Sequence, residues 1–427
     1  MKGRFKIFSD PVHGFISVPN GLILSLIDTP EVQRLRRIRQ LGIGYLVFPG
    51  AEHSRFGHAL GAMALMHDCL SSLSEKDVAI SPEEHTAAMA AALLHDIGHG
   101  PFSHTLENEV IKGFRHEEMS RVFLAALNKR FDGALDLALE IFDNSYPRQF
   151  FHDLVSSQLD MDRLDYLRRD SYYTGVVEGR IGVERIIKTM RVVHEQKAGI
   201  SSERIVIESR GMHAVENFLI ARRMMYWQVY LHKTILAGDH LLQSIIRRVR
   251  WLIKNDRRGD VQGTSPAFLF FLDRAVRPDE ISQPDVIHHF CSLDDTDIIY
   301  SLKSWMGSED RVLSDLCRRV INRSFFRVRF ITEPVSDLLR ENWKDRVVSF
   351  LKSQGISSTE SAESDAQYYL AFATSRHEAY EKAQNSIGVL QNNEVLELSE
   401  ALEVSALSGL TERESRQYIC FPKELEP

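Results

Sequence analysis

The chain has 427 residues, of which 52 are basic and 59 are acidic, and its formal net charge is −7. This length allows a large hydrophobic core, and the acidic balance argues against a general nucleic-acid-binding protein. The four cysteines form no CxxC pair, which excludes the common zinc-finger and disulfide-scaffold patterns. No segment has the pattern of a signal peptide or of a membrane span, so we expect a cytoplasmic protein without a membrane partner.

The first elements are two predicted strands and a helix. Residues 5–8 and 15–18 are strand-like and flank a turn rich in Asp, Pro and Gly. Thr29 and Pro30 then predict the start of a helix that continues to Gly42. Four arginines crowd the faces of this helix that its apolar stripe leaves free: Arg34, Arg36, Arg37 and Arg39. The pattern favours a solvated helix face over an anion-binding face.

The segment from Leu94 to His104 contains three histidines and one aspartate. It follows a predicted helix over residues 82–94 that begins with a capping box of Ser81 and Glu84 and is apolar on most sides. A loop rich in glycine and proline ends this helix just after His95 and Asp96. A polar pair in the last turn of a buried helix needs a partner, and a metal ion is the simplest one.

Two distant residues are candidate partners for His95 and Asp96. His58 directly precedes a predicted helix over residues 59–71, and Asp162 lies in an acidic stretch over 158–170. Two imidazoles and two carboxylates form a site that suits Mn, Fe, Zn or Mg. A helix with i,i+4 ion pairs explains the acidic stretch equally well. The His67-Asp68 dipeptide lacks the glycine loop, so we interpret it as a partly exposed helix pair.

Phosphate-ester cleavage requires cations around the non-reacting oxygens and an acid for the leaving oxygen. Arg55, Arg163 and Lys233 are the candidate cations, and His104 or His99 is the candidate acid. The pattern favours a metal-dependent phosphohydrolase over a structural metal site.

The sequence pattern of the second half of the chain predicts a mainly α fold with a few strands. Helical patterns cover 211–249 and 264–319, strand patterns cover 326–330, 368–372, 387–390 and 394–398, and a linker is predicted at 352–365. The turn residues Gln391-Asn392-Asn393 predict that the last two strands form a hairpin. We therefore expect a helical core over residues 1–260 and a smaller helical and α+β region over 261–427, packed on that core.

These motifs resemble the HD-domain superfamily, whose signature H…HD…D matches His58, His95-Asp96 and Asp162. More narrowly, the chain is similar to the deoxynucleoside triphosphate triphosphohydrolases of the SAM-and-HD-domain type. The shared stretches lie within residues 4–240 and include 10–14, 27–30, 40–42, 47–51, 95–104 and 164–170. The resemblance implies an HD-type helical core, without a SAM domain, that hydrolyses a dNTP to deoxynucleoside and inorganic triphosphate.

The resemblance also implies roles for individual residues. The metal ligands would be His58, His95, Asp96 and Asp162. The substrate contacts would be Gln40, Leu41, Arg55, Arg163, Tyr166, Asp170, Arg222, Tyr230 and Lys233, with little room for a 2′-hydroxyl. His104 would be the general acid or base, oriented by His116 and Glu107, and His99 is a further catalytic candidate.

Three departures from the animal enzymes limit what can be transferred. Arg163 replaces a Lys, Glu107 replaces an Asp, and Leu231 replaces a Gln near the base, so base preference stays open.

Regulation and assembly are also expectations from the resemblance. Lys6, Asp28 and Arg36 match part of a regulatory nucleotide site, which makes nucleotide activation a hypothesis. A homo-oligomer, dimer or tetramer, is expected. Two alternatives stay open: an HD-type nucleotide phosphomonoesterase or phosphodiesterase, and a non-catalytic nucleotide sensor.

Overall fold

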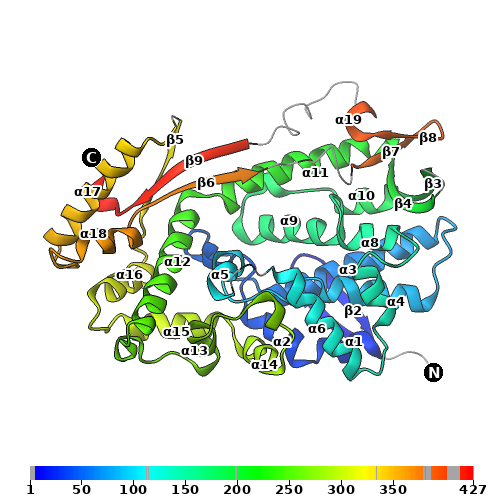
Figure 1. Cartoon of the computed structure of the whole chain (residues 1–427). Coiled ribbons are helices and arrows are strands. Elements are labelled where there is room, and N and C mark those ends of the chain that lie inside the picture. The colour runs from blue at the N-terminus through cyan, green and yellow to red at the C-terminus, as the bar shows by residue number, and fades with distance from the viewer. Residues whose placement is uncertain are drawn as a thin grey trace.

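The fold is mainly α-helical, which confirms the predicted class (Figure 1). The computed structural model describes residues 5–426 except 112, 114, 198–199, 333, 378–379, 381–385 and 402–413. Within these residues, no helix has the length and apolar character needed to cross a bilayer.

The chain begins with the predicted hairpin. Strands β1 (Phe5–Asp10) and β2 (Gly14–Pro19) are antiparallel, with Phe5 opposite Pro19. Two short helices follow, α1 (Leu22–Ile27) and α2 (Pro30–Arg34).

The prediction of one helix as far as Gly42 is wrong. A 3-10 turn (Leu35–Arg37) follows α2, and Ile38 is extended. The Gln40 N–H donates to the His53 carbonyl at 3.0 Å, and the Arg55 N–H donates to the Ile38 carbonyl at 2.9 Å. This pairing satisfies backbone groups that helical hydrogen bonds would otherwise have satisfied.

Helices α3 (Arg55–Ser74), α4 (Pro82–Leu94) and α9 (Met161–Thr174) form the centre of the first region. The predicted capping box of Ser81 and Glu84 begins α4. The surrounding helices are α5 (Ser103–Val110), α6 (His116–Arg130), α7 (Asp136–Phe142), α8 (Phe150–Val155) and α10 (Val183–Thr189).

The second half contains α11 (Met212–Met225), a π-helical turn (Tyr226–Tyr230), α12 (Lys233–Lys254), α13 (Pro266–Asp273), α14 (Pro284–Ser292), α15 (Asp295–Trp305), α16 (Arg311–Ile321), α17 (Asp337–Ser353), α18 (Ala362–Asp365) and α19 (Leu398–Ala401). Helix α12 contacts α5, α13 and α16 (Figure 1). The linker predicted at 352–365 is wrong in part, because α17 extends to Ser353 and the buried Ala362 begins α18.

The remaining strands form two small sheets. One has the order β3 (Met190–Lys197), β4 (Ile200–Glu208), β7 (Gly388–Gln391) and β8 (Glu394–Glu397), and the other has the order β5 (Arg327–Ile331), β9 (Glu414–Phe421) and β6 (Ala371–His377). The predicted β7–β8 hairpin is confirmed, whereas the β3–β4 hairpin was not predicted. Strand β7 pairs with β4 in parallel, so the C-terminal region extends a sheet that residues 190–208 begin.

One hydrophobic cluster connects both regions of the chain. It contains Leu94 and Phe123 from the first region and Phe271, Leu302 and Leu313 from the second. The C-terminal region is therefore packed on the first region, and α14 contacts α2.

Candidate metal centre and substrate pocket

The four predicted metal ligands converge in the structure. His58 comes from α3, His95 and Asp96 follow the end of α4, and Asp162 lies in the first turn of α9. Each residue offers one ligand atom, and these atoms all lie within 4.8 Å of one another. His58 Nε2 is 3.1 Å from Asp162 Oδ1 and 3.4 Å from His95 Nε2.

Hydrogen bonds on the far side of each ring orient the two histidines. His58 Nδ1 donates to Asp165 Oδ2 at 2.7 Å, and His95 Nδ1 donates to the Ala92 carbonyl at 2.7 Å. With the proton held on Nδ1, each ring directs the lone pair of Nε2 into the cluster. Two nitrogen lone pairs beside two carboxylates are a donor set that fits a divalent cation.

The electrostatics of the cluster also favour added positive charge. Burial lowers the pKa of His58, but hydrogen bonds to Asp162 and Asp165 outweigh burial and raise the pKa to about 10. Burial likewise lowers the pKa of His95, but Asp96 and Asp162 raise it to about 9. Burial raises the pKa of Asp162, but the two imidazoles hold this pKa far below its usual range. A bound cation would stabilise the two ionised carboxylates in the same way as the protonated imidazoles do.

A pocket beside the cluster combines ligand carboxylates with cations. Asp96 and Asp162 line it together with Arg55 and Arg163. Arg55 is buried, and its Nη1 donates to Asp96 Oδ2 at 2.7 Å. Arg163 forms an ion pair with Asp160, the N-cap of α9. Fixed guanidinium groups beside a cation site are suited to bind phosphate oxygens.

The same pocket brings together eight of the nine predicted substrate residues: Gln40, Leu41, Arg55, Arg163, Tyr166, Asp170, Arg222 and Tyr230. Asp170 Oδ1 accepts a hydrogen bond from His53 Nε2 at 2.8 Å, and Oδ2 accepts one from the Tyr230 hydroxyl at 2.7 Å. Lys233 is exposed and is not part of this lining. Its Nζ lies 5.3 Å from the centre of the Phe330 ring instead.

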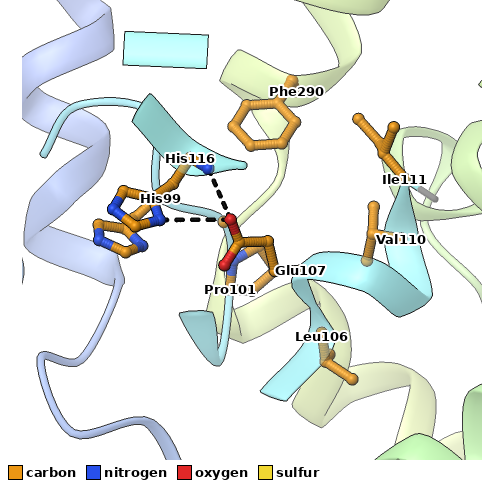
Figure 2. A pocket seen from close by; sticks show the side chains of 9 residues that line it. His99, Pro101, Leu106, Glu107, Val110, Ile111, His116 and Phe290 are labelled. Carbon is orange, nitrogen blue, oxygen red and sulfur yellow. Dashed lines mark hydrogen bonds and ion pairs between the residues drawn. The ribbon is translucent and has the colours of Figure 1, made fainter. Parts of the chain in front are cut away.

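Figure 2 shows His99 and His116 side by side, with Glu107 pointing toward His116. The rings of His99 and His116 stack with centroids 3.8 Å apart, and His99 Nε2 lies 3.4 Å from Asp96 Oδ1. Glu107 accepts hydrogen bonds from the His116 N–H at 2.6 Å and from His116 Nδ1 at 3.2 Å. Three of the four predicted catalytic residues, His99, His116 and Glu107, therefore form a connected row that begins at Asp96. His104 lies in α5, and its side chain is outside the described part of the structure.

Arg34 is a site residue that sequence reasoning missed. It is completely buried, and its Nη2 donates to the carbonyls of Ile97 at 3.0 Å and His99 at 2.8 Å. Burial lowers its pKa to about 10. The prediction that these arginines lie on a solvated helix face is therefore wrong for Arg34, because loop carbonyls and the Phe290 ring replace water around its guanidinium. No sequence signal separates Arg34 from the three neighbouring arginines.

The candidate regulatory residues lie near the N-terminal hairpin. Lys6 Nζ is 3.7 Å from Asp28 Oδ1, and the Arg36 guanidinium lies 3.6 Å from the centre of the Phe56 ring. Lys6 and Asp28 are thus exposed and lie within ion-pair distance of each other, whereas Arg36 packs on an aromatic ring.

Comparison with known proteins shows which family the chain resembles. The HD domain model matches residues 55–169, and the HD associated region model matches residues 181–257. The uncharacterized protein YwfO of Bacillus subtilis is 35% identical, over 98% of this chain and 93% of that protein. Human deoxynucleoside triphosphate triphosphohydrolase SAMHD1 is 30% identical, over 53% of this chain and 42% of that protein.

Solved structures extend the comparison. The crystal structure of a phosphohydrolase from Bacteroides thetaiotaomicron matches with a TM-score of 0.88 and 41% identity, over 98% of this chain and 100% of that one. Since this likeness and the likeness to YwfO extend over nearly the whole chain, and the HD model covers the helices that carry His58, His95, Asp96 and Asp162, the protein belongs to the HD-domain phosphohydrolase family.

Proposed function

We propose that the protein is a cytoplasmic, metal-dependent enzyme that hydrolyses a dNTP to deoxynucleoside and inorganic triphosphate. The observation that carries this proposal is the shared pocket, in which Asp96 and Asp162 face the same space as Arg55 and Asp170. Such a pocket offers a cationic end for phosphates and a polar end for a sugar. The similarity to deoxynucleoside triphosphate triphosphohydrolases, at 26% to 30% identity, supports this substrate class.

The metal would be held by His58, His95, Asp96 and Asp162, and the donor set leaves Mn, Fe, Zn and Mg open. When bound, a divalent ion in such a site polarises a phosphoryl oxygen and lowers the pKa of water. Arg55 and Arg163, which line the pocket, would neutralise the non-reacting phosphate oxygens.

The sugar would lie between Gln40, Leu41, Asp170 and Tyr230. Because both carboxylate oxygens of Asp170 already accept a hydrogen bond, its remaining lone pairs point in fixed directions and can receive a sugar hydroxyl. Tyr166 and Arg222 complete this end of the pocket. We expect these walls to leave no room for a 2′-hydroxyl.

His104 would donate the proton to the leaving oxygen, and His116 and Glu107 would orient it. We expect His104→Ala to lower kcat by about 10²–10⁴-fold while metal content and substrate affinity stay at the wild-type level. Steady-state kinetics, metal analysis and equilibrium substrate binding measure these quantities, and His67→Ala is the control on an exposed histidine. An unchanged kcat would remove His104 from the mechanism.

The substrate assignment is tested by incubating the protein with each dNTP and NTP, with Mn²⁺ or Mg²⁺, and identifying the products. Inorganic triphosphate together with deoxynucleoside supports the proposal. Release of monophosphate or of free phosphate instead supports a nucleotide phosphodiesterase or phosphomonoesterase. Tight binding without turnover supports a nucleotide sensor.

Activation by a nucleotide at Lys6, Asp28 and Arg36, and a homo-oligomer of two or four chains, are part of the proposal. The contact of Lys6 with Asp28 supports a polar site there. Light scattering with and without added nucleotide measures the oligomer, and Lys6→Ala should remove the response. A response that survives Lys6→Ala argues against this site.

A further inference from the structure

A carboxylate from the C-terminal region makes hydrogen bonds to two segments that border the substrate pocket. Asp295, the first residue of α15, is buried. Its Oδ2 accepts a hydrogen bond from the Arg39 N–H at 3.0 Å, and its Oδ1 accepts one from the Phe102 N–H at 3.1 Å. Arg39 directly precedes Gln40 and Leu41, which line the pocket, and Phe102 lines it as well.

The two segments that Asp295 joins approach each other closely. A Cβ atom on Gly42 would lie 3.6 Å from the Cα atom of Phe102. Phe102 has a φ of +49°, a left-handed conformation that is unfavourable for a bulky side chain. Such a conformation persists only where the surroundings hold it, and the hydrogen bond to Asp295 is one such constraint.

The residues next to Asp295 make contacts of their own, separate from those of its carboxylate. Asp294, rather than Asp295, caps α15, because its carboxylate accepts from the Thr296 N–H at 2.9 Å. Asp294 also forms an ion pair with Arg37, and the Leu293 carbonyl accepts from Arg34 Nη1 at 3.2 Å. Arg39 Nη1 adds an ion pair with Asp295 Oδ2 at 3.6 Å. Both hydrogen bonds that the Asp295 carboxylate makes in the described part of the chain thus go to pocket segments, not to its own helix.

We infer that Asp295 is a positioning residue that clamps the lining segment of residues 39–42 to the adjoining lining segment at Phe102. Its two oxygens fix the relative position of these two segments, and therefore the shape of the pocket beside Gln40 and Leu41. The hydrogen bonds of the clamp do not depend on which reaction the protein catalyses, whereas an effect on the choice between dNTP and NTP rests on the proposed function. This gives residues 261–427 a role in the pocket that the HD motifs do not reveal.

The matched variants are Asp295→Asn and Asp294→Asn. An asparagine has one acceptor oxygen, so Asp295→Asn must release either the Arg39 or the Phe102 N–H. Asp294→Asn makes the same chemical change one residue away, keeps a capping oxygen and leaves the clamp intact. Amide hydrogen exchange at Arg39 and Phe102 is the first measurement, because it needs no substrate.

In the wild-type protein, we expect both amides to exchange slowly, although neither makes a helical hydrogen bond in the described residues. Asp295→Asn should speed exchange by about fivefold or more at one of them, and Asp294→Asn should not. If both amides exchange fast in the wild-type protein, the proposed clamp is contradicted. This outcome is measured on the wild type, so it decides the proposal even if Asp295→Asn fails to fold. Equal effects of the two variants overturn it as well.

The second measurement is the ratio of kcat/KM for each dNTP to kcat/KM for the matching NTP. We expect Asp295→Asn to lower this ratio by about tenfold with unchanged metal content, and Asp294→Asn to leave it within about twofold. Faster exchange with an unchanged ratio overturns the role in selectivity. If the wild-type protein hydrolyses no dNTP, the proposed function fails, and the exchange data alone decide the clamp.

Discussion

The buried carboxylate of Asp165 controls how His58 can meet a metal ion. It accepts hydrogen bonds from His58 Nδ1 at 2.7 Å, from His13 Nε2 at 2.6 Å and from Arg169 Nε at 2.9 Å. Burial raises the pKa of Asp165, but Arg169 and the two histidines hold this pKa well below its usual range. The ionised carboxylate therefore keeps the proton of His58 on Nδ1 and leaves Nε2 available as a ligand.

This geometry predicts that Asp165→Asn lowers the affinity for Mn²⁺ by about 10–100-fold. The carboxamide has one acceptor oxygen for several donors, so the His58 ring loses its fixed orientation. Isothermal titration of the metal-free protein measures the affinity. Asp68→Asn, in the exposed His67-Asp68 pair, is the control and should bind like the wild type. Equal affinities for all three proteins would show that Asp165 does not orient His58.

Sequence reasoning predicted the four candidate ligands that the structure brings together, but not the residues that support them. His95 and Asp96 were predictable because a polar pair before a glycine loop has few structural explanations. Asp165 follows Asp162 by about one helical turn, and this spacing was a usable signal. Arg34 gave no such signal, because its partners are backbone carbonyls, and these carry no side-chain pattern that a sequence displays.

At the level of elements, the loop between α4 and α5 depends on close contact with α6. A Cβ atom on Gly98 would lie 2.2 Å from the His116 carbonyl oxygen and 2.3 Å from the Ser120 nitrogen. The Gly98 N–H also donates to Ser120 Oγ at 2.9 Å. The absence of a side chain at Gly98 therefore lets α6 place His116 beside His99.

We expect Gly98→Ala to lower the free energy of unfolding by about 1–3 kcal/mol, because α6 must move away from the added methyl group. The same movement should separate His116 from His99 and reduce turnover. Gly100→Ala is the matched control, since a Cβ there would lie 3.6 Å from the Phe290 ring, an ordinary contact. Urea unfolding measures both variants, and equal stabilities would contradict the close packing of Gly98.

Elements with strong local signals were predicted well, and elements set by distant contacts were not. The capping box at Ser81 specifies the start of α4 locally. Residues 38–40 leave the helical conformation because they pair with residues 53–55, a partner that periodicity does not reveal. The β7–β8 hairpin was visible from its turn, whereas the parallel pairing of β7 with β4 joins segments about 180 residues apart in the sequence.

At the scale of the whole molecule, a buried ion cluster joins α12 to the C-terminal region. Arg248 on α12 pairs with Asp310, the N-cap of α16, at 2.7 Å and with Asp365 at the end of α18 at 2.9 Å. The side chains of all three residues are at most 7% exposed, so water screens these pairs little. Burial raises the pKa of Asp310, but hydrogen bonds from Arg248 and the Leu313 N–H hold it below its usual value.

A carboxyl whose pKa is lower in the folded state stabilises the fold above its unfolded pKa of about 4, and this stabilisation is lost as the pH falls further. We therefore expect Asp310→Asn to lower the free energy of unfolding by about 3 kcal/mol at pH 7. The difference from the wild type should shrink below about pH 4. Urea unfolding across this pH range tests the prediction, with the exposed Asp279→Asn as control. A constant difference at every pH would contradict it.

The metal content of the purified protein tests the four-ligand site directly. If His58, His95, Asp96 and Asp162 hold a divalent ion, the wild-type protein should retain about one equivalent after dialysis. His58→Ala and Asp96→Ala should lose both this metal and the hydrolysis of nucleotides, while their circular dichroism stays like that of the wild type. Variants that keep wild-type metal content would contradict the ligand assignment and the mechanism built on it.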